Sequence, residues 1–247
     1  MREREAARSH FGKRAERYDR SASWVRDEAL IARIRDLAEA GPDAAVLDLA
    51  TGTGAVSEAF RGRVRRIVGL DLCPDMTAKS SRPWDELVAG EAEKLPFPAG
   101  TFDACVCRQG LQFMDAPRAA AEILRVLKPG GRAVLCHLTA YGEADQETTF
   151  LVQRLRNPAR RNFFMPDDVP ALLRAAGFRD VESCEYLSEE SVDRWIDHGA
   201  ISAQDMEAIR QAYRDSSEEF RRLHRVRFAD GDIFDTMKFV LARGRKA

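Results

Sequence analysis

Apolar residues in the first half of the chain form short runs that alternate with helical patterns. Runs typical of buried strands cover 45–49, 66–71, 86–90, 104–107 and 132–137. Helical patterns lie between them at 27–38, 55–60 and 117–127, with a short helix before 86–90. Strands that alternate with helices build a parallel sheet that carries helices on both faces. The sequence therefore predicts a doubly wound α/β fold.

The second half of the chain departs from this alternation. A helical pattern over 166–176 stops at Gly177, and strands are predicted at 180–187 and 233–242. About forty-five residues separate these two strands, far more than a hairpin needs. A helix is expected around 192–200, and Ser202 with Asp205 marks another helix start. Apolar residues then recur at helical spacing, namely Met206, Ile209, Tyr213, Phe220 and Leu223.

We expect 188–228 to be a helical insertion between the last two strands. Ligands of such sheets bind at the carboxyl ends of the strands, so the insertion is predicted to cover that edge as a lid or substrate wall. Structural padding and a dimer surface are the alternatives. The chain is predicted to be one domain, 1–247, with an N-terminal helical arm at 1–40 and this lid.

The loop after the first strand indicates a nucleotide-bearing cofactor. Gly52 and Gly54 allow a tight turn on which a ligand lies directly against the backbone. The second strand ends in Asp71, where a carboxylate can bind a ribose diol. Ser57 replaces the third glycine of a dinucleotide loop, and Asp48 would repel a pyrophosphate but suits an ammonium group.

This loop resembles the D-x-G-x-G-x-G motif of the class I methyltransferases, which use S-adenosylmethionine (SAM). It reads Asp48, Ala50, Gly52, Gly54, so alanine stands at the first glycine. Residues 90–135 resemble the central block of the same family, in the branch of the ubiquinone/menaquinone and biotin-pathway methyltransferases. The resemblance covers about 10–140 and implies a seven-stranded Rossmann-like sheet whose last strand is antiparallel. It is specific for SAM and much less specific for the substrate.

The N-terminal arm adds a further match. Phe11, Ala15, Tyr18 and Asp19 resemble an F-x-x-x-A-x-x-Y-D pattern that the family folds over SAM, and the first three share one face of a helix. The alternative is a helix that packs its aromatic rings on the domain. The resemblance implies a cofactor shell made of Tyr18, Asp48, Ala50, Gly52, Gly54, Asp71, Leu72, Glu91, Ala92, Glu93 and Gln109, with Phe11 as a further candidate.

Composition narrows the partners. The net charge is −1 although 32% of the residues are charged, and no basic run follows a nucleic-acid backbone, so no nucleic-acid partner is expected. The cluster Arg154, Arg156, Arg160, Arg161 is read as a solvated face or as part of a site mouth. The apolar runs are too short to span a membrane, and the N-terminus lacks a signal peptide, so a cytoplasmic protein without membrane contact is expected. The five cysteines and four histidines form no metal-ligand spacing, and no metal is expected.

Methyl transfer from a sulfonium requires mainly alignment and desolvation, and a base helps where the acceptor carries a proton. The candidates near strands four and five are Arg108, Gln112 and His137, with Gln109 beside them. His137 is either a base or a histidine hydrogen-bonded at a strand end, and Arg108 holds a carboxylate or points away. The predicted function is methylation of a small molecule by a monomer or homodimer. The alternatives are an RNA or protein methyltransferase, a non-catalytic SAM-binding regulatory protein, and a nucleotide-dependent oxidoreductase.

Overall fold

The sheet is built outward from β1, all of whose residues are buried. The computed structural model describes residues 2–81 and 83–247; Met1, where the expected arm begins, lies outside the described residues. The strands are β1 (Ala45–Leu49), β2 (Arg66–Asp71), β3 (Glu86–Ala89), β4 (Phe102–Arg108), β5 (Leu127–Thr139), β6 (Arg179–Ser191), β7 (Arg227–Ala229) and β8 (Asp232–Arg245). Their order is β3-β2-β1-β4-β5-β8-β6, and β7 pairs only with β8.

The parallel part of the sheet follows the predicted pattern. Strands β1 to β5 pair in parallel, and β8 inserts antiparallel between β5 and β6. The predicted doubly wound Rossmann-like sheet is confirmed. The short β7 adds a strand to the predicted seven, because the chain turns back on β8 just before that strand begins.

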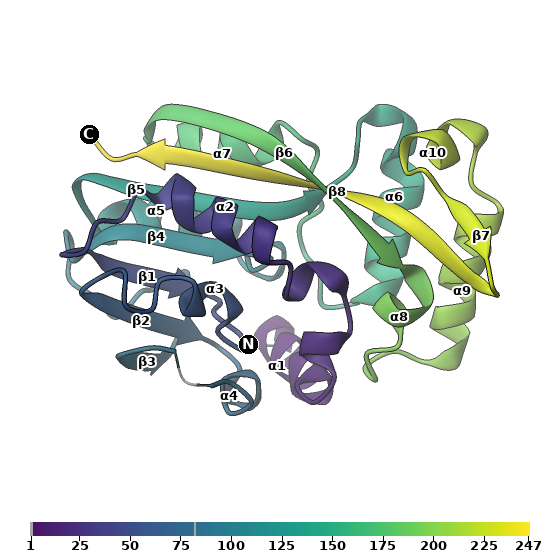
Figure 1. Cartoon of the computed structure of the whole chain (residues 1–247), viewed down its shortest axis with the longest axis horizontal. Coiled ribbons are helices and arrows are strands. Elements are labelled where there is room, and N and C mark those ends of the chain that lie inside the picture. The colour runs from purple at the N-terminus through teal and green to yellow at the C-terminus, as the bar shows by residue number, and fades with distance from the viewer. Residues whose placement is uncertain (1, 82) are drawn as a thin grey trace.

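Helices cover both faces of the sheet (Figure 1). The helices are α1 (Arg2–Arg14), α2 (Glu28–Ala38), α3 (Ala55–Glu58), α4 (Pro74–Thr77), α5 (Ala116–Val126), α6 (Glu143–Arg156), α7 (Asp168–Ala176), α8 (Val192–Ile196), α9 (Ala203–Arg214) and α10 (Glu218–Leu223). Leu30 of α2 packs with Val46 on one face, and Ile123 of α5 packs with Leu47 on the other. Alternate residues of β1 thus enter two separate cores.

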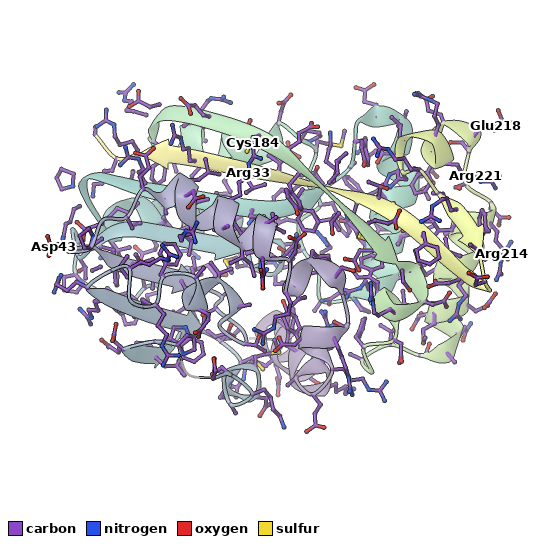
Figure 2. The ribbon with its side chains drawn as sticks, in the orientation of Figure 1. Arg33, Asp43, Cys184, Arg214, Glu218 and Arg221 are labelled. Carbon is purple, nitrogen blue, oxygen red and sulfur yellow. The ribbon has the colours of Figure 1, made fainter. Side chains whose placement is uncertain are left out.

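Strands β6 and β8 extend past the carboxyl ends of the parallel strands and carry the lid at the end of the molecule (Figure 1). Figure 2 labels Asp43 at the opposite end, before β1, and Arg214 and Glu218 in the lid. Ile209, Tyr213 and Phe220 turn inward into the core that α2 also joins, as their spacing predicted. Among the described residues, no helix combines the length and the apolar character that crossing a membrane requires.

Several predicted boundaries were wrong. Helix α6, which the sequence did not indicate, precedes β6 and packs against α9 of the lid, and β6 itself continues to Ser191, inside the expected insertion. Helix α8 stops at Ile196, short of the expected 200. Helix α1 ends at Arg14, and Tyr18 begins a separate 3-10 helix, η1 (Tyr18–Arg20), so the Phe11–Tyr18 segment is not one continuous helix face.

Candidate functional site

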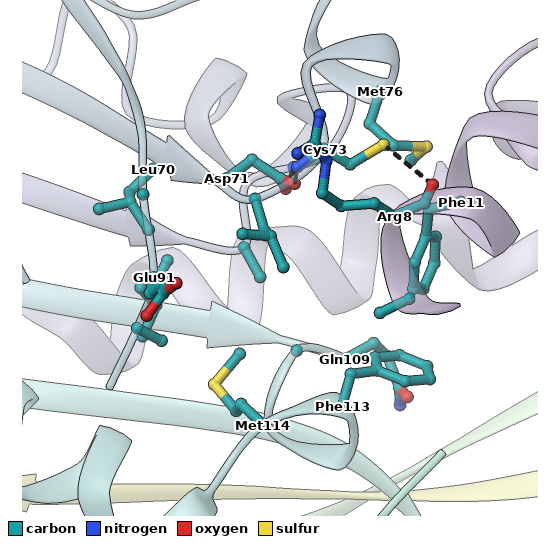
Figure 3. Close-up of a pocket in the computed structure, with 18 of the residues that line it drawn as sticks. Arg8, Phe11, Leu70, Asp71, Cys73, Met76, Glu91, Gln109, Phe113 and Met114 are labelled. Carbon is teal, nitrogen blue, oxygen red and sulfur yellow. Dashed lines mark hydrogen bonds between the residues drawn. The ribbon is translucent and has the colours of Figure 1, made fainter. Parts of the chain in front are cut away.

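A cavity opens at the carboxyl ends of the first four parallel strands, where this fold binds its ligands. Its empty space is about 790 Å³, open mouth included. The walls are the turns after β1 (Leu49, Ala50, Gly52), β2 (70–73), β3 (90–93) and β4 (108–110), with Phe11 and Tyr18 from the arm. Figure 3 shows Asp71, Glu91, Gln109 and Phe113 around this space, which we call the first cavity.

The side chain of Asp48 supports the loop after β1. This carboxylate is 2% exposed and accepts hydrogen bonds from the hydroxyls of Thr51 (2.7 Å) and Ser57. Burial raises the pKa of Asp48, while the two hydroxyls oppose that rise. The side chain therefore lies under the loop, outside the walls of the first cavity, and it holds the loop in shape.

The two loop glycines have different surroundings. Gly52 has φ +56° and borders the cavity. Gly54 has φ +82° and faces away, where an added Cβ would lie 2.6 Å from Pro83. Gly54 is thus required by the turn and by close packing and does not contact the cavity.

Asp71, at the end of β2, has both carboxylate oxygens fixed by backbone. Oδ2 accepts from the Gly52 amide and Oδ1 from the Cys73 amide, each at 2.8 Å. Burial raises the pKa of Asp71 to about 6, against the lowering effect of these two amides. Each oxygen keeps a further lone pair, so the carboxylate can accept two ligand hydroxyls without losing its support.

The turn after β3 supplies the next wall, with Glu91, Ala92 and Glu93, and Leu72 lies across from it. Glu93 accepts a hydrogen bond from the Asp115 amide (3.0 Å), which ties this turn to the start of α5. Ala92 is buried. The turn therefore brings carboxylates and backbone to the wall of the first cavity, and its contact with adenine stays a prediction.

The N-terminal arm closes the first cavity from outside. The Phe11 ring meets the Phe113 ring edge-on at 4.9 Å, and the Thr53 hydroxyl donates to Asp19 at 2.6 Å. The Cys73 thiol faces the Arg8 carbonyl at 3.7 Å (Figure 3). These contacts hold the arm against the loops after β1 and β2.

A second cavity lies beside the first, with about 410 Å³ of empty space, open mouth included. Both cavities are lined by Phe11, Tyr18, Gln109 and Phe113, which therefore form a shared wall. The remaining lining comes from the arm and its continuation, from Gln112 beside Phe113, from Leu138 of β5, from α6 and the turn after it, and from Trp195 of α8. The second cavity thus lies between the arm and the lid.

The three predicted catalytic residues lie in different places. Arg108 borders the first cavity and donates from Nη1 to the carbonyls of Trp24 and Val25, both at 3.1 Å. Gln112 lines the second cavity. His137 is completely buried and borders neither cavity.

A hydrogen-bonded chain links two of these residues to the shared wall. His137 Nδ1 lies 3.2 Å from Gln112 Oε1, and Gln112 Nε2 donates to Gln109 Oε1 at 2.8 Å. Because the amide oxygen only accepts, His137 carries its hydrogen on Nδ1. Gln109 Nε2 at the end of the chain is buried without a partner in the described structure, and Gln109 has φ +55°. An unpaired donor on a strained residue is typical of a ligand site.

Several lining residues were not predicted as site residues. Phe113 and Met114 follow the β4 turn, and Arg14 and Asn157 border the second cavity. Arg156 and Arg160 belong to the basic cluster noted in the sequence. That cluster was interpreted either as a solvated face or as part of a site mouth. Nothing in the local pattern distinguishes the buried Arg156 and the partly buried Arg160 from the exposed Arg154.

Comparison with known proteins gives the family. Residues 47–135 match a family model described as a methyltransferase domain. A demethylmenaquinone methyltransferase from Streptomyces avermitilis is 36% identical over 168 residues, which span 64% of this chain and 73% of that protein. The chain belongs to the SAM-dependent methyltransferases.

A further relative and a solved structure support the same family and fold for this methyltransferase. Malonyl-[acyl-carrier protein] O-methyltransferase from Serratia marcescens is 31% identical over 166 residues, 66% of this chain and 64% of that protein. The crystal structure of the YcgJ protein from Bacillus subtilis superposes with a TM-score of 0.80 at 25% identity, over 87% of this chain and 97% of that one. The predicted family and fold are confirmed.

SAM is the cofactor of this methyltransferase, and the first cavity has the chemistry to take it. The carboxylate of Asp71 suits ribose hydroxyls. The rings of Phe11 and Tyr18 offer π-faces, which attract cations such as a sulfonium. Among the described residues, the cations that line the cavity are Arg8 and Arg108, and Arg108 already donates to two backbone carbonyls. The buried Asp48 lies under the loop where a dinucleotide pyrophosphate would bind. The residues that line the first cavity therefore fit SAM better than a dinucleotide.

Proposed function

We propose that SAM occupies the first cavity and that a small-molecule acceptor occupies the second. Asp71 would bind the ribose, the turn at Glu91, Ala92 and Glu93 would border the adenine, and the Gly52 turn would contact the methionine part. The single observation that carries the proposal is the shared wall, because it separates a cofactor-sized space from a second space that the lid borders through Trp195. Residues 188–228 then act as part of the acceptor wall through Trp195.

The transfer itself is a displacement at carbon. A lone pair of the acceptor forms the new bond to the methyl carbon. The sulfur–methyl bond breaks with its electron pair left on sulfur, which yields S-adenosylhomocysteine. Where the accepting atom carries a proton, that proton passes to water or to a base. Exclusion of water and alignment across the shared wall are the protein's contribution.

We infer that His137 positions Gln112 and Gln109 and does not act as the base. Burial, with a smaller contribution from Arg160, lowers the pKa of His137 to about 3, so the ring stays neutral at working pH. The Nδ1–H of His137 donates to the Gln112 oxygen and fixes the Gln112 side chain. Gln112 in turn binds the Gln109 oxygen, which orients the unpaired Gln109 amide nitrogen toward the ligands.

His137→Gln is expected to lower kcat about tenfold, because the loss of one positioning hydrogen bond has an effect of about this size. The affinity for SAM is expected to stay within twofold of wild type. The kcat–pH profiles of both proteins are expected to show no transition near 6.5. A transition near 6.5 that disappears in the variant would instead assign His137 as the base.

Calorimetry tests the cofactor site. SAM and S-adenosylhomocysteine are expected to bind in the micromolar range, and NADH is expected not to bind. Turnover, measured as S-adenosylhomocysteine released with phenols, quinols, amines and acids, then identifies the acceptor class. Tight NADH binding without SAM binding would contradict the proposal.

Partners and assembly follow as further proposals. We expect a monomer or homodimer that acts in the cytoplasm, with neither nucleic acid nor membrane as partner. Ultracentrifugation measures the assembly, and RNA added to the turnover assay is expected to leave S-adenosylhomocysteine release unchanged.

A further inference from the structure

Three arginine side chains line the second cavity and come from two segments of the chain. Arg14 is the last residue of α1, Arg156 the last of α6, and Arg160 lies in the turn that follows α6. Arg14 is 2% exposed and Arg156 is 7% exposed. Three positive groups are thus gathered around one cavity.

None of the three has an ion-pair partner among the described residues, and each keeps a buried N–H without an acceptor: Nε of Arg14, Nη2 of Arg156 and Nη2 of Arg160. Elsewhere, by contrast, Arg243 pairs with Glu182 at 2.8 Å, although both lie at the surface. Burying a guanidinium without a counter-charge is costly, so such groups are normally paired.

The existing contacts of the three arginines leave their charge uncompensated. Arg156 Nε donates to the Trp195 carbonyl at 3.0 Å, and Arg160 Nε donates to the Asn162 carbonyl at 3.0 Å. Arg14 only approaches the rings of Phe11 and Tyr18, 5.1 and 5.2 Å from their centroids. Burial lowers the pKa of Arg14 to about 10 and that of Arg160 to about 9, which reflects the same missing counter-charge.

The nearby buried acid is already engaged. Glu190 is completely buried, but its two oxygens accept from the backbone amides of Ser23 (2.9 Å) and Trp24 (3.0 Å). It closes the turn of the arm and does not bind the three arginines. Among the described residues, no carboxylate pairs with the three arginines, which leaves the position of a counter-charge open to a ligand.

Side-chain amides next to Arg156 also lack partners. Both side-chain polar atoms of Gln153 and the Nδ2 of Asn157 are buried without hydrogen bonds in the described structure. Trp24 and Trp195 supply flat apolar surface around them. The lining thus combines cations, amides and aromatic rings, which is the composition of a site for a polar small molecule.

We propose that the acceptor is a small anion whose carboxylate or phosphate group is bound by Arg14, Arg156 and Arg160. Guanidinium groups suit both oxyanions, since each presents forked N–H donors. The anionic group lies beyond the shared wall, because Arg156 and Arg160 line only the second cavity. The atom that receives the methyl group then points back toward Gln109. This inference rests on the proposed use of the second cavity for the acceptor.

Calorimetry on the protein saturated with S-adenosylhomocysteine tests the proposal. The probes are benzoate, phenyl phosphate and inorganic phosphate, with neutral benzamide as the matched control. At least one anionic probe is expected to bind ten times or more tighter than benzamide. Preference for benzoate or for phenyl phosphate distinguishes a carboxylate from a phosphate acceptor.

Variants locate the anion. Arg14→Met and Arg156→Met are each expected to weaken the anionic probe at least tenfold. Arg154→Met changes an exposed arginine of the same helix and is expected to leave the affinity unchanged. Since Arg14 makes no hydrogen bond that folding requires, Arg14→Met is expected to unfold at the same temperature as wild type or higher.

The outcomes separate the two proposals. If S-adenosylhomocysteine binds but no anion binds better than benzamide, the anionic acceptor is wrong and the cofactor site stands. The inference is also overturned if Arg14→Met and Arg156→Met both bind the anionic probe as tightly as wild type. This holds even if both variants unfold at a lower temperature. Failure of S-adenosylhomocysteine to bind, measured first on the same samples, contradicts the proposed function instead.

Discussion

Ala50 has φ +56° at the position where the family motif has glycine. The left-handed conformation costs an alanine about 1–2 kcal/mol. Its methyl group faces Gly110, where an added Cβ would lie 2.7 Å from the Ala50 Cβ. The two residues are therefore complementary: a side chain on one requires glycine at the other.

Gly110→Ala is consequently expected to destabilise the protein by about 1–3 kcal/mol through overpacking. Ala50→Gly alone is expected to change the free energy of unfolding by between zero and about 1 kcal/mol in the stabilising direction. Glycine relieves the backbone strain of the folded state but adds entropy to the unfolded chain. The double variant recovers part of the loss, measured by urea denaturation. Gly41→Ala, which has open space, is the control. Strict additivity of the two changes would contradict the proposed complementarity.

Asp71 is the residue on which SAM affinity is expected to depend most. Asp71→Ala removes a charged acceptor worth about 1.5–3 kcal/mol, so the dissociation constant should rise roughly tenfold to a hundredfold. The ligand-free pKa of about 6 adds a second expectation. Below that pH the carboxyl is protonated and loses an acceptor, so wild-type affinity should fall as pH falls through 6.

Asp75→Asn, in the neighbouring helix α4 and outside the first cavity, serves as the control in calorimetry between pH 5 and 7.5. The Asp71→Ala variant should show no such pH dependence. An unchanged dissociation constant in this variant would mean that the ribose is bound elsewhere.

At the scale of elements, a buried histidine links the lid to both α6 and β8. His224, after α10, lies 2.9 Å from Asp145 of α6 and 2.8 Å from Asp235 of β8, and its ring stacks on Phe220. Burial alone would lower the pKa of His224, but hydrogen bonds and charge from the two carboxylates raise it to about 9. The charged histidine thus connects three elements.

Stability should therefore decrease in alkaline solution. The folded pKa lies above the unfolded value of about 6.5, so the contribution is complete below pH 6.5 and is lost as pH rises through about 9. Its size is about 3 kcal/mol at most. Urea denaturation of wild type at pH 6 and 9.5 measures it. His224→Gln should be less stable at pH 6 and nearly independent of pH, and a wild type equally stable at both pH values would contradict the assignment.

The elements differed in how well the sequence predicted them. The first four parallel strands have apolar runs followed by glycine or acidic turns, and this pattern placed Asp71 and Gly52 correctly at the cavity. Helix α6 escaped detection because Gly142 precedes it instead of a capping side chain, and polar residues fill its first two turns. Its start is supported instead by Asp145, which accepts from the amides of Tyr141 and Gly142.

The second cavity could not be predicted from local pattern. Its arginines come from residues 14, 156 and 160, and only the packing of the arm against α6 brings them together. The burial of His137 likewise depends on Phe164, whose ring lies 5.4 Å away and which comes from a turn with no marked periodicity. Such contacts are set by tertiary packing, which single-residue preferences do not describe.

For the whole molecule, the lid is part of the main core. Ile209, Tyr213 and Phe220 are almost completely buried together with strand residues such as Val134. Burying such side chains contributes about 1.5–3 kcal/mol each, and a domain has only about 5–15 kcal/mol in total. The lid therefore cannot be removed as a separate unit.

Replacing 188–228 by a short linker is accordingly expected to abolish cooperative thermal unfolding, and with it SAM binding, as measured by scanning calorimetry. Arg214→Gln, an exposed change within the lid, should unfold cooperatively at close to the wild-type temperature. A deletion protein that folds and binds SAM like wild type would show that the lid is only an addition to the sheet.

The shared wall has a thermodynamic consequence. Phe11 and Tyr18 of the arm border both cavities, so a ligand that holds the arm in place prepares it for the other ligand. Linkage then requires that each ligand raise the affinity of the other by the same factor. Donor and acceptor are then expected to be reciprocal effectors of one another, because the residues of the shared wall border both binding sites.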